Sequence, residues 1–164
     1  MDRNGWLEQA MAQWEVPLLR TCYLLLGDAA LSEDALQETF IRAWKGYGSF
    51  RGESSEKTWL MRIAVNVCRD LRRSRWFRHV DRRVRMEDLP EPAAPFEEED
   101  DTLTRAILSL PHSLRQVITL RYFQGLSVQE TAQAAGISVR TVHYRQERAR
   151  HLLKIQLEEE DDEA

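Results

Sequence analysis

The chain is 164 residues long, 43% hydrophobic and 30% charged, with 23 lysines and arginines against 27 acidic residues. No run approaches the length of a membrane span, and the first residues lack the apolar core of a signal peptide, so we expect a cytoplasmic protein. The two cysteines and four histidines show no metal-ligand spacing, and no glycine-rich phosphate loop or nucleophile motif occurs, so we expect no metal, no cofactor and no enzymatic activity.

The first informative helix is predicted over residues 32–44, SEDALQETFIRAW. We expect Ser32 to cap it and Glu33 to lie in its first turn, where the helix dipole favours acidic groups. Its apolar stripe comprises Leu36, Phe40, Ala43 and Trp44. Another face carries two acids, an amide and an aliphatic group: Asp34, Gln37, Glu38 and Ile41. This mixture suits a protein interface, although it is also common on a face that contacts only water.

A second helix is predicted from residue 56 onward, in EKTWLMRIAVNVCRDLRR. Apolar residues recur at helical spacing and should face the core: Trp59, Leu60, Ile63, Ala64, Val67, Cys68 and Leu71. The other side carries Arg62, Asn66, Arg69 and Arg73. Nine arginines occur within residues 62–85, and Trp76 and Phe77 stand among them. This combination suits phosphates and unstacked bases. The alternative is an arginine-rich helix end that pairs with the acidic residues that follow.

An acidic segment divides the chain. Residues 86–101, MEDLPEPAAPFEEEDD, hold three prolines and eight acids without a base, which predicts a solvated, flexible linker. Residues 102–156 hold eight basic and two acidic groups, and residues 157–164 hold six acids and no base. Because phosphates sense charge within about a Debye length, the acidic whole-chain balance does not exclude nucleic-acid binding. We expect domains at 1–80 and 102–156, a linker at 81–101 and an acidic tail.

Residues 125–153, GLSVQETAQAAGISVRTVHYRQERARHLL, contain two helix starts eleven residues apart. Ser127 and Glu130 have the spacing of a capping box, Gly136 should end the first helix, and Ser138 should begin a second that reaches about Leu153. The predicted buried stripe is Val139, Val142, Ala149 and Leu153. The remaining face is basic, hydroxylic and aromatic: Arg140, Thr141, His143, Tyr144, Arg145 and Arg148. Such a helix-turn-helix suits the DNA major groove, and an ordinary αα-hairpin is the alternative.

The predicted fold is therefore all-α, with two small helical domains, the second containing the helix-turn-helix. Four segments of the chain resemble the extracytoplasmic-function (ECF) group of bacterial sigma factors, in the sigma-70 family. They are SEDALQETFIRAW, SFRGESSEKTWLMRIAVNVCRDLRR, SLPHSLRQVITLRYFQGLSVQETAQAAGISVRTV and RARHLL. The resemblance covers nearly all of both domains and implies a promoter-binding region 2, a flexible linker and a promoter-binding region 4.

The resemblance also implies roles for single residues. Asp34, Gln37 and Glu38 match the motif that docks on the β′ clamp helices of core RNA polymerase, and Ile41 shares their face. For the −10 element the matching positions are Asn66, which helps to capture a flipped base, and Arg62, Arg69, Arg72 and Arg73. For the −35 element they are Arg140, Thr141, His143, Tyr144, Arg145 and Arg148. Further implied partners are the β flap, promoter DNA and an anti-sigma factor, often membrane-bound.

Three positions depart from the family pattern. The family usually has a small residue at Tyr144 and an aliphatic one at Gln146, and Glu147 adds a negative charge near expected phosphates. The implied function is recruitment of polymerase to promoters and melting of the −10 DNA. A two-domain helix-turn-helix regulator without polymerase docking is the alternative, and it would not need Asp34, Gln37 and Glu38. A helical adaptor that binds only proteins is disfavoured by the two arginine-rich faces.

Overall fold

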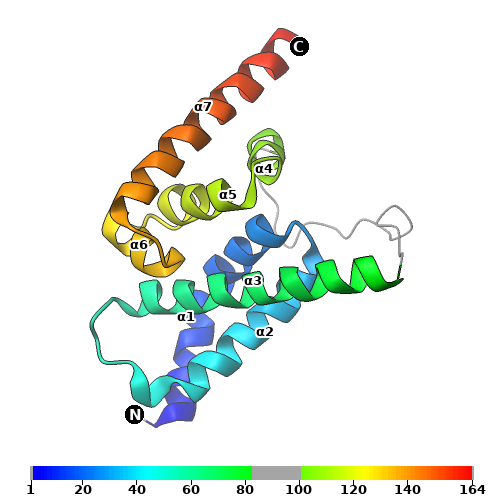
Figure 1. Cartoon of the computed structure of the whole chain (residues 1–164). Coiled ribbons are helices and arrows are strands. Elements are labelled where there is room, and N and C mark those ends of the chain that lie inside the picture. The colour runs from blue at the N-terminus through cyan, green and yellow to red at the C-terminus, as the bar shows by residue number, and fades with distance from the viewer. Residues whose placement is uncertain (1, 83–100, 164) are drawn as a thin grey trace.

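The computed structural model describes residues 2–82 and 101–163, and these form seven α-helices and no strand (Figure 1). The predicted all-α fold is confirmed. The first half of the chain contains α1 (Arg3–Leu26), α2 (Ala29–Lys45), the 3-10 turn η1 (Tyr47–Ser49) and α3 (Glu56–Arg82). The second half contains α4 (Asp101–Leu108), α5 (His112–Ile118), the π-helical turn η3 (Thr119–Phe123), α6 (Val128–Ala135) and α7 (Val139–Glu163). Residues 83–100 of the predicted linker lie outside the described residues.

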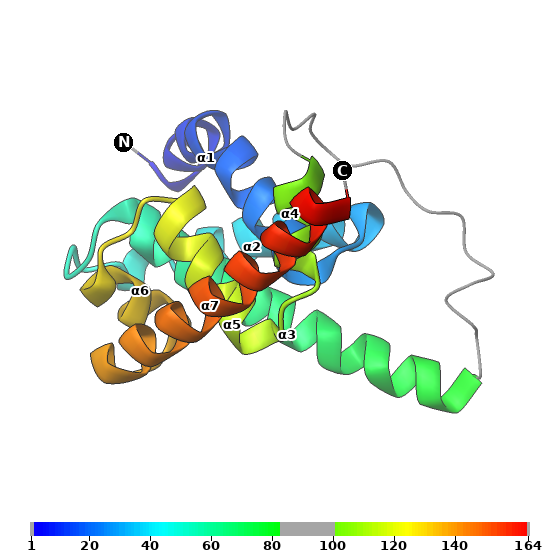
Figure 2. The same cartoon turned by 90° about the horizontal axis from the view of Figure 1, so that it is seen from above.

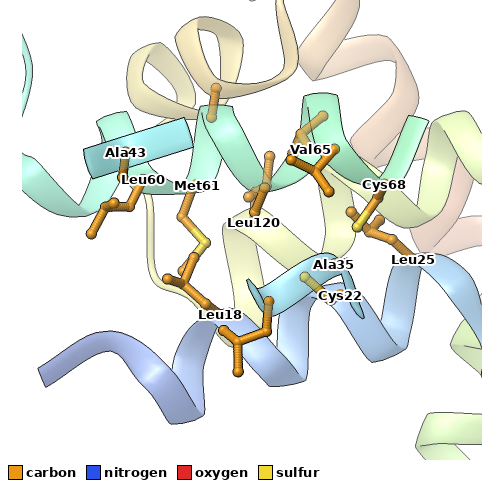
Figure 3. Packing of buried hydrophobic residues seen from close by; sticks show 14 of the residues in the cluster. Leu18, Cys22, Leu25, Ala35, Ala43, Leu60, Met61, Val65, Cys68 and Leu120 are labelled. Carbon is orange, nitrogen blue, oxygen red and sulfur yellow. The ribbon is translucent and has the colours of Figure 1, made fainter. Parts of the chain in front are cut away.

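Among the described helices, none combines the length and apolar character that a bilayer crossing requires. The two cysteines, Cys22 on α1 and Cys68 on α3, are buried free thiols. They lie together between these helices (Figure 3). A hydrogen bond with the Cys22 thiol and burial raise the pKa of Cys68 well above its usual value, so this thiol stays protonated.

The start of α2 differs from the prediction. Gly27 ends α1 in the left-handed conformation, with φ 68°, and the Asp28 carboxylate accepts a hydrogen bond from the Leu31 N–H at 3.0 Å. Asp28 is therefore the cap, and the predicted cap at Ser32 is wrong. Ser32 is buried one turn inside the helix, where its hydroxyl donates to the Asp28 carbonyl at 2.6 Å. The glycine turn lets α2 begin three residues before the sequence pattern indicated.

Helix α3 is buried over a wider band than its apolar spacing predicted. The predicted core residues Leu60, Ala64, Val67 and Cys68 are buried, and so are Thr58, Met61 and Val65. Three neighbouring helices explain the extra width, because α1 and α2 pack on one side of α3 and α6 packs on another. Between Thr58 and Cys68, what remains for solvent is one side of the helix.

The two halves of the chain share an apolar core. Leu120 of η3 is fully buried in one cluster with Leu18 of α1 and Met61 of α3 (Figure 3). In the opposite direction, Leu24 of α1 is fully buried among second-half residues that include Ile107. Figures 1 and 2 show the second half lying along the first, with α6 against α3, while α4, α5 and η3 contact α1.

His112, at the start of α5, lies where the two halves meet and among cationic side chains. Burial lowers its pKa to about 4, and Arg72, Arg115 and Arg69 contribute in the same direction. A hydrogen bond with the Leu25 backbone offsets part of this shift. The ring also bonds the Gln116 side chain at 2.9 Å, so His112 is held as the neutral imidazole at neutral pH.

We expect His112→Gln to flatten the dependence of folding stability on pH. The pKa of His112 is about 4 in the folded protein against an ordinary 6.5. Its stabilising contribution is therefore complete above pH 6.5 and is lost as the pH falls from 6.5 towards 4. In urea titrations between about pH 7 and 5, the unfolding free energy of the parent should fall more steeply than that of the variant. Parallel curves would contradict this assignment.

Candidate nucleic-acid and protein interfaces

The exposed strip of α3 carries the residues predicted to meet DNA. Arg62, Asn66, Arg69 and Arg73 follow one another at intervals of four, three and four residues, so they share one face of the helix. The three arginines are exposed and Asn66 is half-buried, with its side-chain oxygen accepting a hydrogen bond from Arg69. This face offers cations to phosphates, and an amide that can both donate and accept toward a base edge.

Arg72 departs from the predicted grouping. It is exposed, but it lies close enough to His112 and Arg115 of the second half to lower the pKa of both. The structure therefore brings four of the five predicted −10 residues onto one face and places Arg72 toward the boundary with α5. The side chains of residues 75–82, including Trp76 and Phe77, lie outside the described part, as do Arg83 and Arg85.

A pocket of about 270 Å³ opens beside Arg62. Its walls come from the α2–α3 connection, the first turns of α3 and one α6 side chain: Ser49, Phe50, Arg51, Glu53, Ser54, Thr58, Trp59, Arg62 and Gln133. The Phe50 and Trp59 rings lie 4.8 Å apart between centroids. Aromatic carbon, a guanidinium and hydroxyl groups are the components that hold a flipped base. This pocket was not predicted from the sequence, because no periodic pattern marks residues 47–54.

The predicted docking face on α2 is largely exposed. Asp34, Gln37 and Ile41 project outward, and 46% of Ile41 is exposed. Glu38 is different because the Arg42 guanidinium binds it at 3.1 Å and also binds Asp70 of α3 at 3.0 Å. This chain of partly exposed ion pairs ties α2 to α3, so Glu38 has an internal partner as well as a surface position.

Gln37 and Ile41 also line a groove of about 710 Å³ between α1 and α2. Its other lining residues are Asn4, Leu7, Met11, Glu15, Glu33, Leu36, Phe40, Trp44 and Lys45. Met11 is 42% exposed, which is unusual for a large apolar side chain on a helix with a packed neighbour. The shape and lining suit an amphipathic helix of a partner. The α1 side of this groove was missed by sequence reasoning, because residues 3–26 contain no marked polar or apolar face.

The local signals of the helix-turn-helix are confirmed. The Glu130 N–H donates to the Ser127 hydroxyl at 3.1 Å, and the Ser127 N–H donates to the Glu130 carboxylate at 2.9 Å, completing the capping box. Gly136 ends α6 with φ 70°. The Ser138 hydroxyl accepts from the Thr141 N–H at 3.1 Å at the start of α7. Helix α7 continues to Glu163, ten residues beyond the predicted end.

The buried stripe of α7 is shifted from the prediction at its first position. Val142 and Ala149 are fully buried as expected, but Val139 is 41% exposed. Ile137, in the turn, packs against the core clusters at this end. Gln146 takes the remaining place in the stripe, where it is buried and accepts a hydrogen bond from Arg121 at 2.9 Å. The unusual polar residue in the core thus has a specific partner.

The outward face of α7 presents most of the predicted −35 residues. Arg140, His143, Tyr144 and Arg148 are exposed, and Tyr144 is 70% exposed. Thr141 and Arg145 are half-buried, and the Thr141 hydroxyl bonds the Ser138 hydroxyl at 2.8 Å. On the same helix Glu147 pairs with Arg150 at 3.5 Å, which reduces its effect on an approaching phosphate.

Comparisons with known proteins agree on one family. Residues 11–78 match the model of sigma-70 region 2, and residues 100–153 match that of sigma-70 region 4. The chain is 34% identical over 154 residues to the ECF RNA polymerase sigma factor SigW of Bacillus subtilis. The aligned region covers 85% of this chain and 82% of SigW. It is 36% identical over 156 residues to the ECF RNA polymerase sigma-E factor of Salmonella typhimurium. This aligned region covers 86% of this chain and 80% of the Salmonella protein.

One solved structure is similar to this chain over most of its length. It is the sigma factor RpoE in complex with the anti-sigma factor NepR from Bartonella quintana. The TM-score is 0.79 at 26% identity, with 92% of this chain and 96% of that chain covered.

Two valines near the start of α7 provide a matched test of its orientation. Val142→Asp should destabilise the second half by about 3–5 kcal/mol, because it buries an unpaired charge. Val139→Asp should leave stability nearly unchanged, since the site is exposed and an acid in the first turn suits the helix dipole. Thermal unfolding followed by circular dichroism measures both. Equal losses in the two variants would mean that α7 is rotated from the position described.

Proposed function

The chain belongs to the ECF group of the sigma-70 family of RNA polymerase sigma factors, and from this membership we propose how its surfaces share the work of initiating transcription. It binds core RNA polymerase and directs the enzyme to promoter DNA. The family consists of regulators, and we infer that all bond formation takes place in the polymerase active site. We also propose that the protein works in the cytoplasm, where both partners are present.

We propose residues 1–80 as region 2 and residues 102–156 as region 4. The observation that carries the function is the α3 strip with its neighbouring pocket. Arg62 belongs to both, so a DNA strand held along Arg69 and Arg73 would pass the pocket mouth. An unstacked −10 base would enter between this arginine and the aromatic wall. Asn66 lies one turn further along the strip and would read a base edge.

The energies are of the right size for local melting. Opening DNA costs about 1.4 kcal/mol per base-pair step, and stacking one base on an aromatic side chain gains about 1–3 kcal/mol. Capture of one or two bases therefore offsets the opening of a short segment, with the arginines contributing the attraction to phosphates. The protein needs no chemical energy source for this step.

For the −35 element we propose the exposed face of α7. Arg140, His143, Tyr144 and Arg148 would enter or border the major groove. Thr141 and Arg145, at the edge of this face, would contact the DNA backbone. Tyr144 has 70% of its surface exposed on this face, and we propose that it gives this protein its own −35 preference.

For polymerase docking we propose the α1–α2 groove. Gln37 and Ile41 line it and Asp34 lies on the same outward face of α2, which suits the β′ clamp helices that the family motif engages. Region 4 would contact the β flap. The structural relative from Bartonella quintana is bound to an anti-sigma factor, and we propose a regulator of that class for this chain too.

We expect Gln37→Ala combined with Ile41→Ala to weaken binding to core polymerase by about 1–2 kcal/mol, roughly five- to thirtyfold. Both side chains line the groove, whereas Glu38→Ala should have a smaller effect because Arg42 already binds that carboxylate. Gln9→Ala, at an exposed α1 position that does not line the groove, is the control. Affinity is measured by fluorescence anisotropy with purified core enzyme. If Glu38→Ala lost more affinity for core polymerase than the double variant, the docking surface would lie on the Glu38 side of α2 and not in the groove.

We expect Asn66→Ala to weaken apparent promoter binding by roughly 1–3 kcal/mol and so to reduce open-complex formation. We also expect it to relax the base preference at one position of the −10 element. Core-polymerase affinity should stay the same, because α2 and the groove are unaffected. The measurement is promoter selection by the reconstituted holoenzyme from a library randomised over the −10 element. If parent and variant selected the same −10 sequences, Asn66 would not read a base. Its role would then be structural, as the hydrogen-bond acceptor for the Arg69 side chain.

A further inference from the structure

The pocket beside Arg62 is built mainly by the connection between α2 and α3, the loop of residues 46–55, which includes η1. This loop supplies most of the pocket wall: Ser49, Phe50, Arg51, Glu53 and Ser54. A wall made by a loop discriminates between bases only when the loop is held in one conformation. The contacts that hold this loop therefore decide how selective the pocket is.

Hydrogen bonds fix the two ends of the loop. At its start, the Ser49 N–H and the Ser49 hydroxyl both donate to the Gly46 carbonyl, at 2.9 Å and 2.7 Å. At its end, the Ser55 hydroxyl accepts from the Thr58 N–H at 3.1 Å, in the first turn of α3. Among the described residues, no backbone–backbone hydrogen bond involves residues 51–54. The remaining support for the loop must come from side chains.

Aromatic side chains from two helices pack on the loop. The Phe50 ring lies 4.8 Å from the Trp59 ring of α3, and the Tyr47 ring lies 5.0 Å from the Trp6 ring of α1, measured between centroids. Trp6 also lies 6.0 Å from Trp59. These are the separations at which tilted ring pairs attract each other. We call the four residues Trp6, Tyr47, Phe50 and Trp59 the aromatic clamp.

Trp6 is the member of the aromatic clamp that contacts both the loop and α3. Phe50 and Trp59 line the pocket, whereas Trp6 and Tyr47 do not. Trp6 is half-buried and packs against the core shared by α1, α2 and α3. Loss of the Trp6 ring would therefore loosen the loop and the Trp59 wall together, without removing any atom that a base in the pocket would touch.

The turn that carries Trp6 is itself fixed in place. The Asp2 carboxylate accepts from the Gly5 N–H at 2.7 Å and caps α1. The Asn4 side-chain oxygen accepts from the indole N–H of Trp44 at 3.0 Å, which ties this turn to the end of α2. Figure 1 shows the start of α1 beside the end of α2, where the loop begins. Trp6 thus has the anchored surroundings that a residue needs in order to position another.

We propose that Trp6 is a positioning residue for base selection at the −10 element. Through Tyr47 and Trp59, it holds the loop of residues 46–55 in the conformation in which the pocket accepts one unpaired base in preference to the others. The inference rests on the proposed capture of a −10 base in this pocket. It gives the first turns of α1, which touch no proposed DNA surface, a part in promoter specificity. A residue that only stabilised the core would affect folding without affecting base preference.

The test compares Trp6→Ala and Trp6→Phe in the full chain, assembled with excess core polymerase so that docking is not limiting. Trp14→Ala is the matched control, because Trp14 is a half-buried α1 tryptophan on the same core that bonds Glu56 of α3 and not the loop. The readout is promoter selection from a library randomised over the −10 element. Phe50→Ala, in the pocket wall, identifies the position that the pocket reads.

We expect Trp6→Ala to reduce the base preference at that position about tenfold, as for a loop that adopts the selective conformation about a tenth of the time. Trp6→Phe should retain most of the preference, because a ring still packs on Tyr47, and Trp14→Ala should match the parent. Unchanged preference in Trp6→Ala, an equal loss in Trp14→Ala, or no recovery in Trp6→Phe would each overturn the proposal.

A second variant covers the case in which Trp6→Ala loses helix content by circular dichroism. Tyr47→Leu removes the ring on the loop side and leaves α1 intact. We then expect at least a threefold loss of preference at the same position, and no loss would overturn the proposal. The proposed function fails in a different way. If Phe50→Ala leaves selection unchanged, no base enters the pocket and both proposals fall, whereas relaxed selection in Phe50→Ala alone removes only the role of Trp6.

Discussion

Burial of α3 from several directions is the constraint on which the rest of the structure depends. Helices α1 and α2 cover one side, α6 covers another, and the buried band runs from Thr58 through Met61 and Val65 to Cys68. Between Thr58 and Cys68, this packing leaves one side of α3 where a charged side chain avoids a desolvation penalty. The positions of Arg62, Asn66, Arg69 and Arg73 follow from this, because they are the places that packing leaves open. The proposed DNA surface thus consists of the positions on α3 that the core does not cover.

Features set by neighbours in sequence could be predicted, and features set by distant contacts could not. The Ser127–Glu130 capping box, the Gly136 turn and the cap at Ser138 involve groups a few residues apart, so their spacing was sufficient evidence. Ser32 failed because Asp28, after a glycine turn, was a better-placed cap. Apolar periodicity showed that α3 has a core face, but its extra width comes from packing against α1 and α2 on one side and against α6, about seventy residues away in the sequence, on another.

In the candidate site, too, the sequence identified residues within single segments but not the surfaces formed by distant segments. Motif matching selected Asp34, Gln37, Glu38 and Ile41, and the structure distinguishes among them, since Glu38 is bound by Arg42 while Gln37 and Ile41 line a groove. The α1 wall of that groove and the pocket beside Arg62 need three-dimensional proximity, which no single segment of sequence contains. Arg72 lies one position from Arg73, yet its charge lowers the pKa of His112 and Arg115 in the second half, because a helix turns by about 100° per residue.

The reciprocal burial of Leu24 and Leu120 limits how modular this two-part protein is. Each leucine occupies a socket built by the other half, so the shape of one half constrains which side chains the other can accept. The acidic segment at residues 86–101 makes the sequence resemble two independent domains that could be exchanged separately. A chimera that joined residues 1–82 to the second half of a relative would combine sockets and side chains that had not evolved together. In this chain, replacing one half to change promoter specificity would also require the shared core between the halves to repack.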